Sequence, residues 1–284
     1  MPLVIDLLSA ALGVEARGLD LRQPPDADTA RALVAAFEQN SVLCIREQRL
    51  SPAQLLTVAK LFGTPKAQVN KHQQLPDAPE VAILSSESRV SDGRETRLVQ
   101  GTTWHTDHSF TVRPPKATLL YAVRLPESGG DTSFCNMRAA YAALPTSTRE
   151  RIGGLNAVHS YESSRSPRKM MRRTTAEEAQ SPDVTHPLVR FHEPTASNAL
   201  YLSTTRLERI VELERTASDA LLDELMVHVD QEQFVYHHAW QAGDVVIWDN
   251  RCLMHHANAD FSLDQPRLMH RVLIEGEAPL PGRH

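Results

Sequence analysis

From residue 81 onward the sequence consists mainly of short apolar segments, and this succession constrains the fold more than any other feature. The segments that predict strands are 81–84, 117–123, 186–191, 199–202, 233–240, 244–248 and 267–274, with Gly, Pro, Asn and Asp clusters between them. Apolar residues recur at helical spacing in 28–40 and 51–63, and later in 137–144 and 218–229. Strands and helices do not alternate as they do in a doubly wound sheet. We therefore predict a mostly β fold with flanking helices, built on a barrel or jelly roll.

The bulk composition predicts an ordinary globular protein. The 284 residues contain no internal repeat and no break in composition, so we expect one domain over residues 1–284. The formal net charge of −5 argues against a nucleic-acid binder, which needs a basic face for the phosphates. No apolar run approaches the roughly 18 residues that cross a bilayer. The three cysteines are widely spaced and the N-terminus lacks a basic signal region, so we expect a soluble, cytoplasmic protein.

One segment, residues 163–183, departs from this globular pattern. Five basic side chains fall within nine positions and are followed by acidic and turn-forming residues. A solvated mobile loop explains this composition. A lid explains it too, because long loops in compact domains often close over active sites.

The segment WHTDHSF (104–110) places two histidines and an aspartate within four positions. His105 and Asp107 are two residues apart, so on a strand both side chains would face the same point. With a distant second histidine they would form a 2-His-1-carboxylate triad, which leaves coordination positions open and suits non-haem Fe(II). A surface His–Asp pair explains the short motif equally well. The metal interpretation therefore needs a third ligand and an anchor for a cosubstrate.

Candidates for both lie near the C-terminus. His255 and His256 are adjacent in WDNRCLMHHANADF (248–261), and strand neighbours face opposite sides, so at most one should bind a metal. Arg267 and Arg271 are four residues apart and would share one face of a strand. An inward guanidinium is costly to bury unless it meets an anion, and its planar fork fits a carboxylate. The pair predicts an anionic cosubstrate and an anionic substrate; surface arginines on an edge strand are the alternative.

Several motifs, in this order, resemble the TauD/TfdA family of Fe(II)/2-oxoglutarate-dependent dioxygenases, which includes taurine dioxygenase and 2,4-dichlorophenoxyacetate dioxygenase. They are GLDLRQP, SVLCIREQRLSPAQLLTVAKLFG, WHTDHSF, PESGGDTSFCNMRAAYAALP, HPLVRFHEP, WDNRCLMHHANADF and RLMHRVLI. The resemblance spans nearly the whole chain. It implies a double-stranded β-helix core (a cupin-like jelly roll), with Fe(II) as the metal and 2-oxoglutarate and O2 as cosubstrates.

The resemblance also implies residue roles at the metal and cosubstrate site. His105, Asp107 and His255 match the iron ligands. Thr132 matches the residue that donates a hydrogen bond to the distal carboxylate of 2-oxoglutarate. Arg267 matches the salt-bridge partner of the same carboxylate.

On the substrate side the resemblance is less complete. Arg271 matches the arginine near the substrate anion. His108 and Phe110 directly follow the ligand motif, and Lys71 and His72 follow the second helix, so we expect these four near the substrate. For Lys71 and His72, an exposed loop position is an equal alternative.

These expectations define a function. We expect hydroxylation of a C–H bond in a small anionic organic substrate, with succinate and CO2 as coproducts. The substrate would be a carboxylate or sulfonate, with aryloxyalkanoate-like compounds among the candidates. A Zn-dependent hydrolase that uses the same triad, and a non-catalytic jelly-roll binding protein, are the alternatives. Neither gives Thr132 and Arg267 a role. Homo-oligomers are common in the family, and the sequence carries no interface signature.

Overall fold

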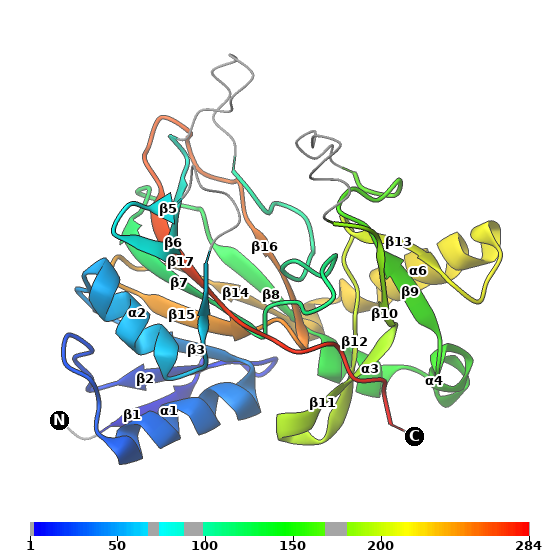
Figure 1. Ribbon diagram of the computed structural model, residues 1–284, viewed down its shortest axis with the longest axis horizontal. Coiled ribbons are helices and arrows are strands. Elements are labelled where there is room, and N and C mark those ends of the chain that lie inside the picture. The colour runs from blue at the N-terminus through cyan, green and yellow to red at the C-terminus, as the bar shows by residue number, and fades with distance from the viewer. Residues whose placement is uncertain (1–2, 68–73, 88–98, 168–180, 284) are drawn as a thin grey trace.

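The computed structural model describes residues 3–67, 74–87, 99–167 and 181–283. Strands dominate it, and helices flank them, which confirms the predicted fold class (Figure 1). The described helices are α1 (Ala27–Asn40), α2 (Pro52–Lys60), α3 (Met137–Ala143), α4 (Thr146–Ile152) and α6 (Arg215–Val229). All but α4 were predicted. Only one residue of α4 is buried, Ile152, so this helix lacks the apolar periodicity by which the others are identified.

The largest sheet forms one wall of the barrel. Its strands follow the order β1 (Val4–Leu7), β2 (Val14–Arg17), β3 (Val42–Ile45), β15 (Val245–Asp249), β7 (Ala117–Arg124), β17 (Leu268–Ile274), β6 (Ala78–Ser85) and β5 (Gln74–Leu75), with β4 (Pro65–Lys66) paired to β17. Helices α1 and α2 pack their apolar sides onto it through an extensive buried cluster that includes Phe37 and Leu55. A capping box of Ser51 and Gln54 starts α2.

A smaller sheet faces this wall. It contains β14 (Val235–His238), β8 (Thr132–Asn136) and β16 (Leu253–Ala257), with β8 in the middle. The ring of Phe134 on β8 lies 5.4 Å, centroid to centroid, from that of Trp248 on β15, so the two sheets pack face to face. This is the arrangement expected of a jelly roll. The chemistry-bearing residues described below lie between the two sheets.

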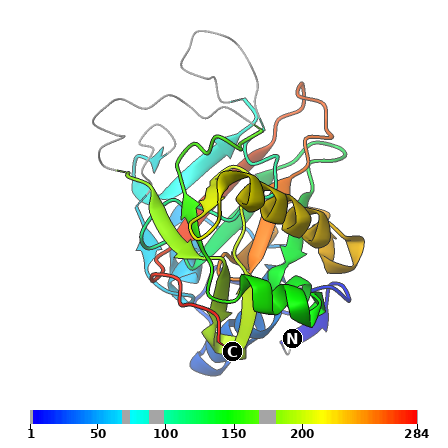
Figure 2. The ribbon, with the colours of Figure 1, turned by 90° about the vertical axis from the view of Figure 1, so that its right-hand side faces the viewer.

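The described residues of 153–167 and 181–229 build a lateral layer. It contains the sheet β10 (Val184–Pro187), β9 (Asn156–His159) and β13 (Leu207–Ile210), and the ribbon of β11 (Val189–His192) with β12 (Ser197–Leu200). Helix α6 lies across the outside of this layer (Figure 2). The single strand predicted at 186–191 is wrong, since β10 and β11 belong to different sheets. Pro187 lacks the N–H that would continue the ladder.

The basic segment 163–183 is described only at its two ends. Arg165 forms ion pairs with Asp219 and Asp223 of α6, each 2.5 Å between nitrogen and oxygen. Residues 168–180, with the other four basic side chains, lie outside the described residues, so the choice between loop and lid stays a prediction. Within the described ranges, no helix is both long and apolar enough to cross a membrane.

A buried ion pair joins the β11–β12 ribbon to the large sheet. His192 Nε2 lies 3.1 Å from Asp249 Oδ2, and neither side chain is exposed. Burial disfavours the imidazolium form, but Asp249 and Cys252 together outweigh this effect and raise the pKa of His192 to about 9. His192 is therefore charged at neutral pH. Asp249 also forms an ion pair with Arg251, with 2.6 Å between Oδ2 and the guanidinium nitrogen.

We expect this pair to make stability fall in the alkaline range. Because the folded-state pKa lies above the ordinary value of 6.5, the stabilisation is complete below pH 6.5 and is lost as the pH rises through about 9. Wild type and His192→Gln should therefore differ in free energy of unfolding by on the order of 2 kcal/mol near pH 6, and by much less near pH 10. Urea denaturation at both pH values measures this, and an equal difference at both would contradict a charged His192.

Candidate active site

Three side chains that the sequence analysis assigns to a metal converge between the two sheets. One ligand atom each from His105, Asp107 and His255 lies within 4.8 Å of the others. Nε2 of His105 is 3.8 Å from Asp107 Oδ1, and Nε2 of His255 is 3.9 Å from Asp107 Oδ2. The carboxylate thus presents one oxygen to each imidazole, which leaves a common point for a cation between them.

The backbone that places His105 and Asp107 is not the strand that the sequence analysis assumed. His105 forms an isolated antiparallel bridge with His255, in which each backbone N–H donates to the other residue's carbonyl at 3.0 and 2.8 Å. Asp107 already lies in the turn that follows, and His108 has a φ of 47°. The alternation argument is therefore wrong in its geometry. The bridge and the turn, rather than the pleat of a strand, bring the two side chains together.

His255 and His256 do face opposite sides of β16, as predicted. His255 is paired with Phe134 and His256 with Ser133 across the small sheet. The His255 ring packs against Trp248 at 4.7 Å between centroids, inside the barrel. The His256 ring instead packs edge-on against Trp104 at 4.3 Å. Only His255 belongs to the converging group.

Two residues that the sequence analysis missed hold the carboxylate of Asp107. Thr118 of β7 donates its hydroxyl hydrogen to Asp107 Oδ2 at 2.5 Å, and accepts at 2.9 Å from the amide of Asn250. All three side chains are buried. The backbone carbonyl of Asn250 also accepts from the Thr106 hydroxyl at 2.9 Å. A lone threonine within the apolar run ATLLYAV was the available signal for Thr118.

The electrostatics suit a metal with neutral imidazole ligands. Burial lowers the pKa of His105, and lowers that of His255 to about 3, so both rings are uncharged at neutral pH and each keeps a single ring hydrogen. Burial alone would raise the pKa of Asp107, but the surrounding histidines and Arg271 lower it, so the carboxylate is ionised. His105 Nδ1 lies 2.7 Å from the carbonyl of Thr103, which places the ring hydrogen there and leaves the Nε2 lone pair for a cation. The donor set fits a divalent first-row metal.

Two other buried groups contain possible metal ligands, but their carboxylates are already paired with an arginine. The first group is Cys44, His238 and Asp244, and the second is His192, Asp249 and Cys252. In each, an arginine already balances the carboxylate: Arg46 with Asp244 and Arg251 with Asp249, both at 2.6 Å. Within the described part of the chain, the only ion-pair partners of Asp107 are the two histidines. The triad is therefore the candidate metal centre.

Thr132 lies on the same side of the small sheet as His255. Thr132 is two residues before Phe134 on β8, and Phe134 is the cross-strand partner of His255, so the side chains of all three share one face. The indole of Trp240 donates to Thr132 Oγ1 at 3.0 Å. The hydroxyl hydrogen of Thr132 can therefore be donated to a further acceptor.

Arg267 offers a cation next to Gly130, which precedes Thr132 by two residues. Its side chain is buried, and Nε donates to the carbonyl of Gly130 at 3.3 Å. Burial lowers the pKa of Arg267 to about 10, and the charge of Asp131 opposes part of that fall. No described carboxylate forms an ion pair with this guanidinium. A buried cation of this kind is costly unless an anion meets it, which fits a carboxylate-bearing cosubstrate.

Arg271 is the second arginine of this segment, and its charge acts on Asp107. It belongs to β17, which begins one residue after Arg267. Burial lowers the pKa of Arg271, and the charge of Asp107 opposes this effect. Arg271 in turn helps to lower the pKa of His108. These effects indicate that the charge of Arg271 lies near the candidate metal centre, and its role toward a substrate anion stays a prediction.

The residues after the ligand motif face two partners that the sequence analysis missed. The ring of Phe110 lies 5.5 Å from that of His108 and 5.2 Å from that of Tyr161. The guanidinium carbon of Arg206 is 4.6 Å from the Phe110 ring and 4.9 Å from the Tyr161 ring. The positive charge of Arg206 adds to the effect of burial in lowering the pKa of His105. Distant loops supply Tyr161 and Arg206, so no local pattern marks them.

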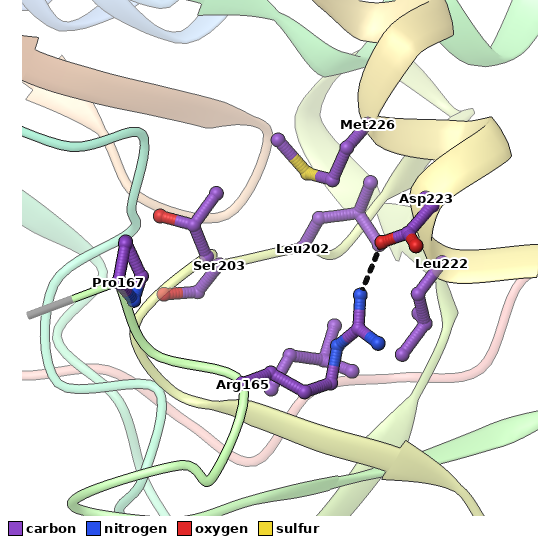
Figure 3. Close-up of a pocket in the computed structure, with 9 residues that line it drawn as sticks. Arg165, Pro167, Leu202, Ser203, Leu222, Asp223 and Met226 are labelled. Carbon is purple, nitrogen blue, oxygen red and sulfur yellow. Dashed lines mark hydrogen bonds and ion pairs between the residues drawn. The ribbon is translucent and has the colours of Figure 1, made fainter. Parts of the chain in front are cut away.

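Lys71 and His72 lie outside the described residues, so their predicted place near the substrate stays a prediction. A separate cavity of about 260 Å³ lies between α6 and the loop 202–207 (Figure 3). Arg165 and Asp223 form an ion pair at its edge. None of the predicted site residues lines it, so the cavity is distinct from the candidate active site.

Comparison with known proteins agrees with this geometry. Residues 5–273 match the family described as "Taurine catabolism dioxygenase TauD, TfdA family". The alpha-ketoglutarate-dependent 2,4-dichlorophenoxyacetate dioxygenase of Cupriavidus pinatubonensis is 37% identical over 257 residues, which cover 86% of this chain and 88% of that protein. The alpha-ketoglutarate-dependent sulfate ester dioxygenase of Pseudomonas putida is 34% identical over 281 residues, which cover 96% and 89%. The crystal structure of AAD-2 in complex with Mn(II) and N-oxalylglycine superposes with a TM-score of 0.83 at 31% identity, covering 98% of this chain and 99% of that one.

Proposed function

The chain belongs to the TauD/TfdA family and is an alpha-ketoglutarate-dependent dioxygenase, and from this premise we propose that it uses Fe(II), held by His105, Asp107 and His255. We propose further that it hydroxylates a C–H bond of a small organic anion and releases succinate and CO2. The observation that carries the proposal is the convergence of two neutral imidazoles and one ionised carboxylate within 4.8 Å. The family assignment leaves the zinc hydrolase and the non-catalytic alternative without support.

Each chemical task of the proposed reaction has a residue in this chain that can perform it. Bound Fe(II), together with 2-oxoglutarate and O2, supplies the oxidising power that a protein side chain lacks. Arg267 and the Thr132 hydroxyl would hold the distal carboxylate of 2-oxoglutarate by a charge-assisted pair and a hydrogen bond, a role that the buried guanidinium and the free hydroxyl hydrogen support. Thr118 keeps the carboxylate plane of Asp107 fixed. The half-buried rings of Phe110 and Tyr161 cover the substrate side and limit access of water.

The substrate class follows from the cations around the centre. Arg271 and Arg206 both act on the electrostatics of the histidines beside the metal position. Both arginines are partly buried, and a positive charge partly withdrawn from water favours an anionic partner. Relatives act on a phenoxyacetate and on sulfate esters, as their names state. We therefore propose a carboxylate, sulfonate or sulfate ester as the substrate, with aryloxyalkanoates as the first candidates.

A succinate-release screen tests this function. Purified protein with Fe(II), 2-oxoglutarate and air is incubated with aryloxyalkanoates, alkyl sulfates, sulfonates and their uncharged amide or alcohol analogues. We expect succinate formation to rise well above the substrate-free rate for at least one anion and for none of the matched uncharged analogues. Equal stimulation by an anion and its uncharged analogue would contradict the anionic substrate class.

Thr118 provides a test of the metal site that needs no substrate. Thr118→Val preserves the shape of the side chain but removes the hydrogen bond to Asp107 and the acceptor for Asn250. Because residues that orient a metal ligand typically contribute about 10- to 100-fold in affinity, the Kd for Mn(II) should rise by about that factor. Anaerobic calorimetric titration measures the Kd. Thr118→Ser, which keeps the hydroxyl, is the matched control, and equal Kd values for the two variants would contradict this role.

We also propose the cytoplasm as the compartment and a free small molecule, rather than nucleic acid or membrane, as the partner. Cys44, Cys135 and Cys252 are all free and buried, which a reducing compartment preserves. Light scattering would determine whether the chain forms the homo-oligomer that is common in the family.

A further inference from the structure

Trp240 restricts the direction of the Thr132 hydroxyl group. Its indole Nε1–H donates to Thr132 Oγ1 at 3.0 Å, and Thr132 is buried. An indole can only donate, whereas a hydroxyl carries one hydrogen and two acceptor positions. The bond from Trp240 occupies one of these positions, so the hydroxyl hydrogen points elsewhere. Among the described residues, no acceptor receives that hydrogen.

The indole is supported by the side chain opposite Thr132. His238 is the cross-strand partner of Thr132 between β14 and β8, so both side chains lie on one face of the small sheet. The His238 ring packs edge-on against Trp240, with 4.6 Å between ring centroids. His238 Nδ1 lies 2.9 Å from the Tyr236 hydroxyl, and its Nε2 lies 3.4 Å from Asp244 Oδ2. These polar neighbours limit rotation of the His238 ring, which therefore supports the indole in one orientation.

The turn that carries Trp240 is fixed as well. The backbone N–H of Gln241 donates to Asp244 Oδ2 at 2.7 Å, and Arg46 pairs with the same oxygen at 2.6 Å. Gly243 has a φ of 90°, and a Cβ there would lie 2.6 Å from a backbone carbonyl oxygen of the loop after β3. Glycine allows this close approach of the turn to the loop. The indole N–H therefore has its direction before any ligand binds.

We propose that Trp240 is a positioning residue for 2-oxoglutarate, which turns the hydroxyl hydrogen of Thr132 toward the distal carboxylate of the cosubstrate. The inference rests on the function proposed above, because that function assigns the distal carboxylate to Thr132 and Arg267. Trp240 acts through the Thr132 hydroxyl.

This arrangement favours a 2-oxo acid that ends in a carboxylate. A hydroxyl that is free to rotate can turn to another acceptor, whereas one that already accepts from the indole cannot donate in that direction. A carboxylate oxygen accepts the remaining hydrogen, and a hydrogen bond to a charged acceptor is stronger than a neutral one. A methyl group in the same place would leave the buried hydrogen without a partner, which costs free energy. Trp240 thus contributes to the choice of cosubstrate.

Anaerobic calorimetry with Mn(II) at the metal site tests this role. The ligands are 2-oxoglutarate and 2-oxopentanoate, which has the same carbon chain but ends in a methyl group. Trp240→Phe keeps an aromatic ring against His238 and removes the N–H. We expect its Kd for 2-oxoglutarate to rise by about 3- to 10-fold, the value of one hydrogen bond, while the Kd for 2-oxopentanoate does not rise. An equal rise for both ligands would show that the indole only supports the fold, and would overturn the inference.

Thr132→Val gives a second comparison, which does not depend on binding of 2-oxopentanoate. Valine has the shape of threonine but no hydroxyl, so adding Trp240→Phe to this variant should not change the 2-oxoglutarate Kd further. Additive losses would contradict coupling through the hydroxyl. A wild-type protein that does not bind 2-oxoglutarate with Mn(II) would refute the proposed function. Wild-type binding that Trp240→Phe leaves unchanged would refute only the role of Trp240.

A measurement on the indole itself holds even if Trp240→Phe does not fold. The indole N–H resonances of the three tryptophans are recorded by NMR of the 15N-labelled protein with Zn(II) at the metal site. The resonance that moves most in Thr132→Val identifies Trp240, because this variant removes the acceptor of its N–H. In the wild type this resonance should shift on addition of 2-oxoglutarate, and less on addition of 2-oxopentanoate. Binding of 2-oxoglutarate without such a shift would contradict the coupling.

Discussion

Replacement of His255 by phenylalanine should reduce 2-oxoglutarate turnover by about 1,000-fold or more, because it removes one of the three proposed metal ligands. Phenylalanine preserves a ring of similar size against Trp248 and Phe134, the two rings that His255 packs against. The loss should therefore come from the metal rather than from the fold. Succinate formation, metal content after loading and Tm together measure this.

The neighbouring histidine is the matched control. His256→Phe makes the same chemical change one residue later, on the opposite face of β16, where the ring packs against Trp104. We expect this variant to bind metal and to retain activity within about tenfold of wild type. If both variants lose metal, or if His256→Phe alone does, the assignment of His255 as the ligand is wrong.

Replacement of Arg267 by methionine should raise the Kd for 2-oxoglutarate by about 100-fold, which corresponds to about 3 kcal/mol for a buried charge pair. The guanidinium has no described counter-ion, so removing its charge leaves no carboxylate of the protein unpaired. The variant should therefore keep the stability of the wild type. Anaerobic calorimetry with Mn(II) measures 2-oxoglutarate binding without knowledge of the substrate.

Arg271→Met is the variant to compare with Arg267→Met, because we expect it to affect the substrate rather than 2-oxoglutarate. Arg271 lies closer to the triad, and its charge acts on Asp107 and His108. We expect it to raise the KM of the anionic substrate far more than that of 2-oxoglutarate, while Arg267→Met does the opposite. Equal effects of the two variants on both ligands would contradict the separate roles of the two arginines.

The parts of the fold that could be predicted from the sequence are those encoded locally. The caps and apolar periodicity of α2, and the buried stripe of α6 at Leu221, Leu222 and Leu225, are properties of a few consecutive residues. Strand β8 was not predicted, although Thr132 was singled out within it. Its five residues lead directly into α3, and the boundary between them depends on the long-range pairing with β16.

At the site, the sequence was most informative about residue types and least informative about their support. The spacing of His105 and Asp107 indicated a shared site, although the strand geometry assumed for it was wrong, and the family resemblance singled out His255 from two adjacent histidines; the structure brings these three side chains together. The support of Asp107 by Thr118 depends on a hydrogen bond between a turn and a strand 11 residues apart, which no short motif encodes. Arg206 reaches the site from a loop about 100 residues away in sequence. Such contacts follow only from the packed fold.

The most direct test of the central claim is the visible absorption spectrum of the anaerobic protein with Fe(II) and 2-oxoglutarate. Chelation of 2-oxoglutarate by Fe(II) at the triad should produce a weak charge-transfer band in wild type and in His256→Phe, and this band should be absent in His255→Phe. A wild-type protein that binds Fe(II) yet shows no such band at saturating 2-oxoglutarate would contradict the proposed function.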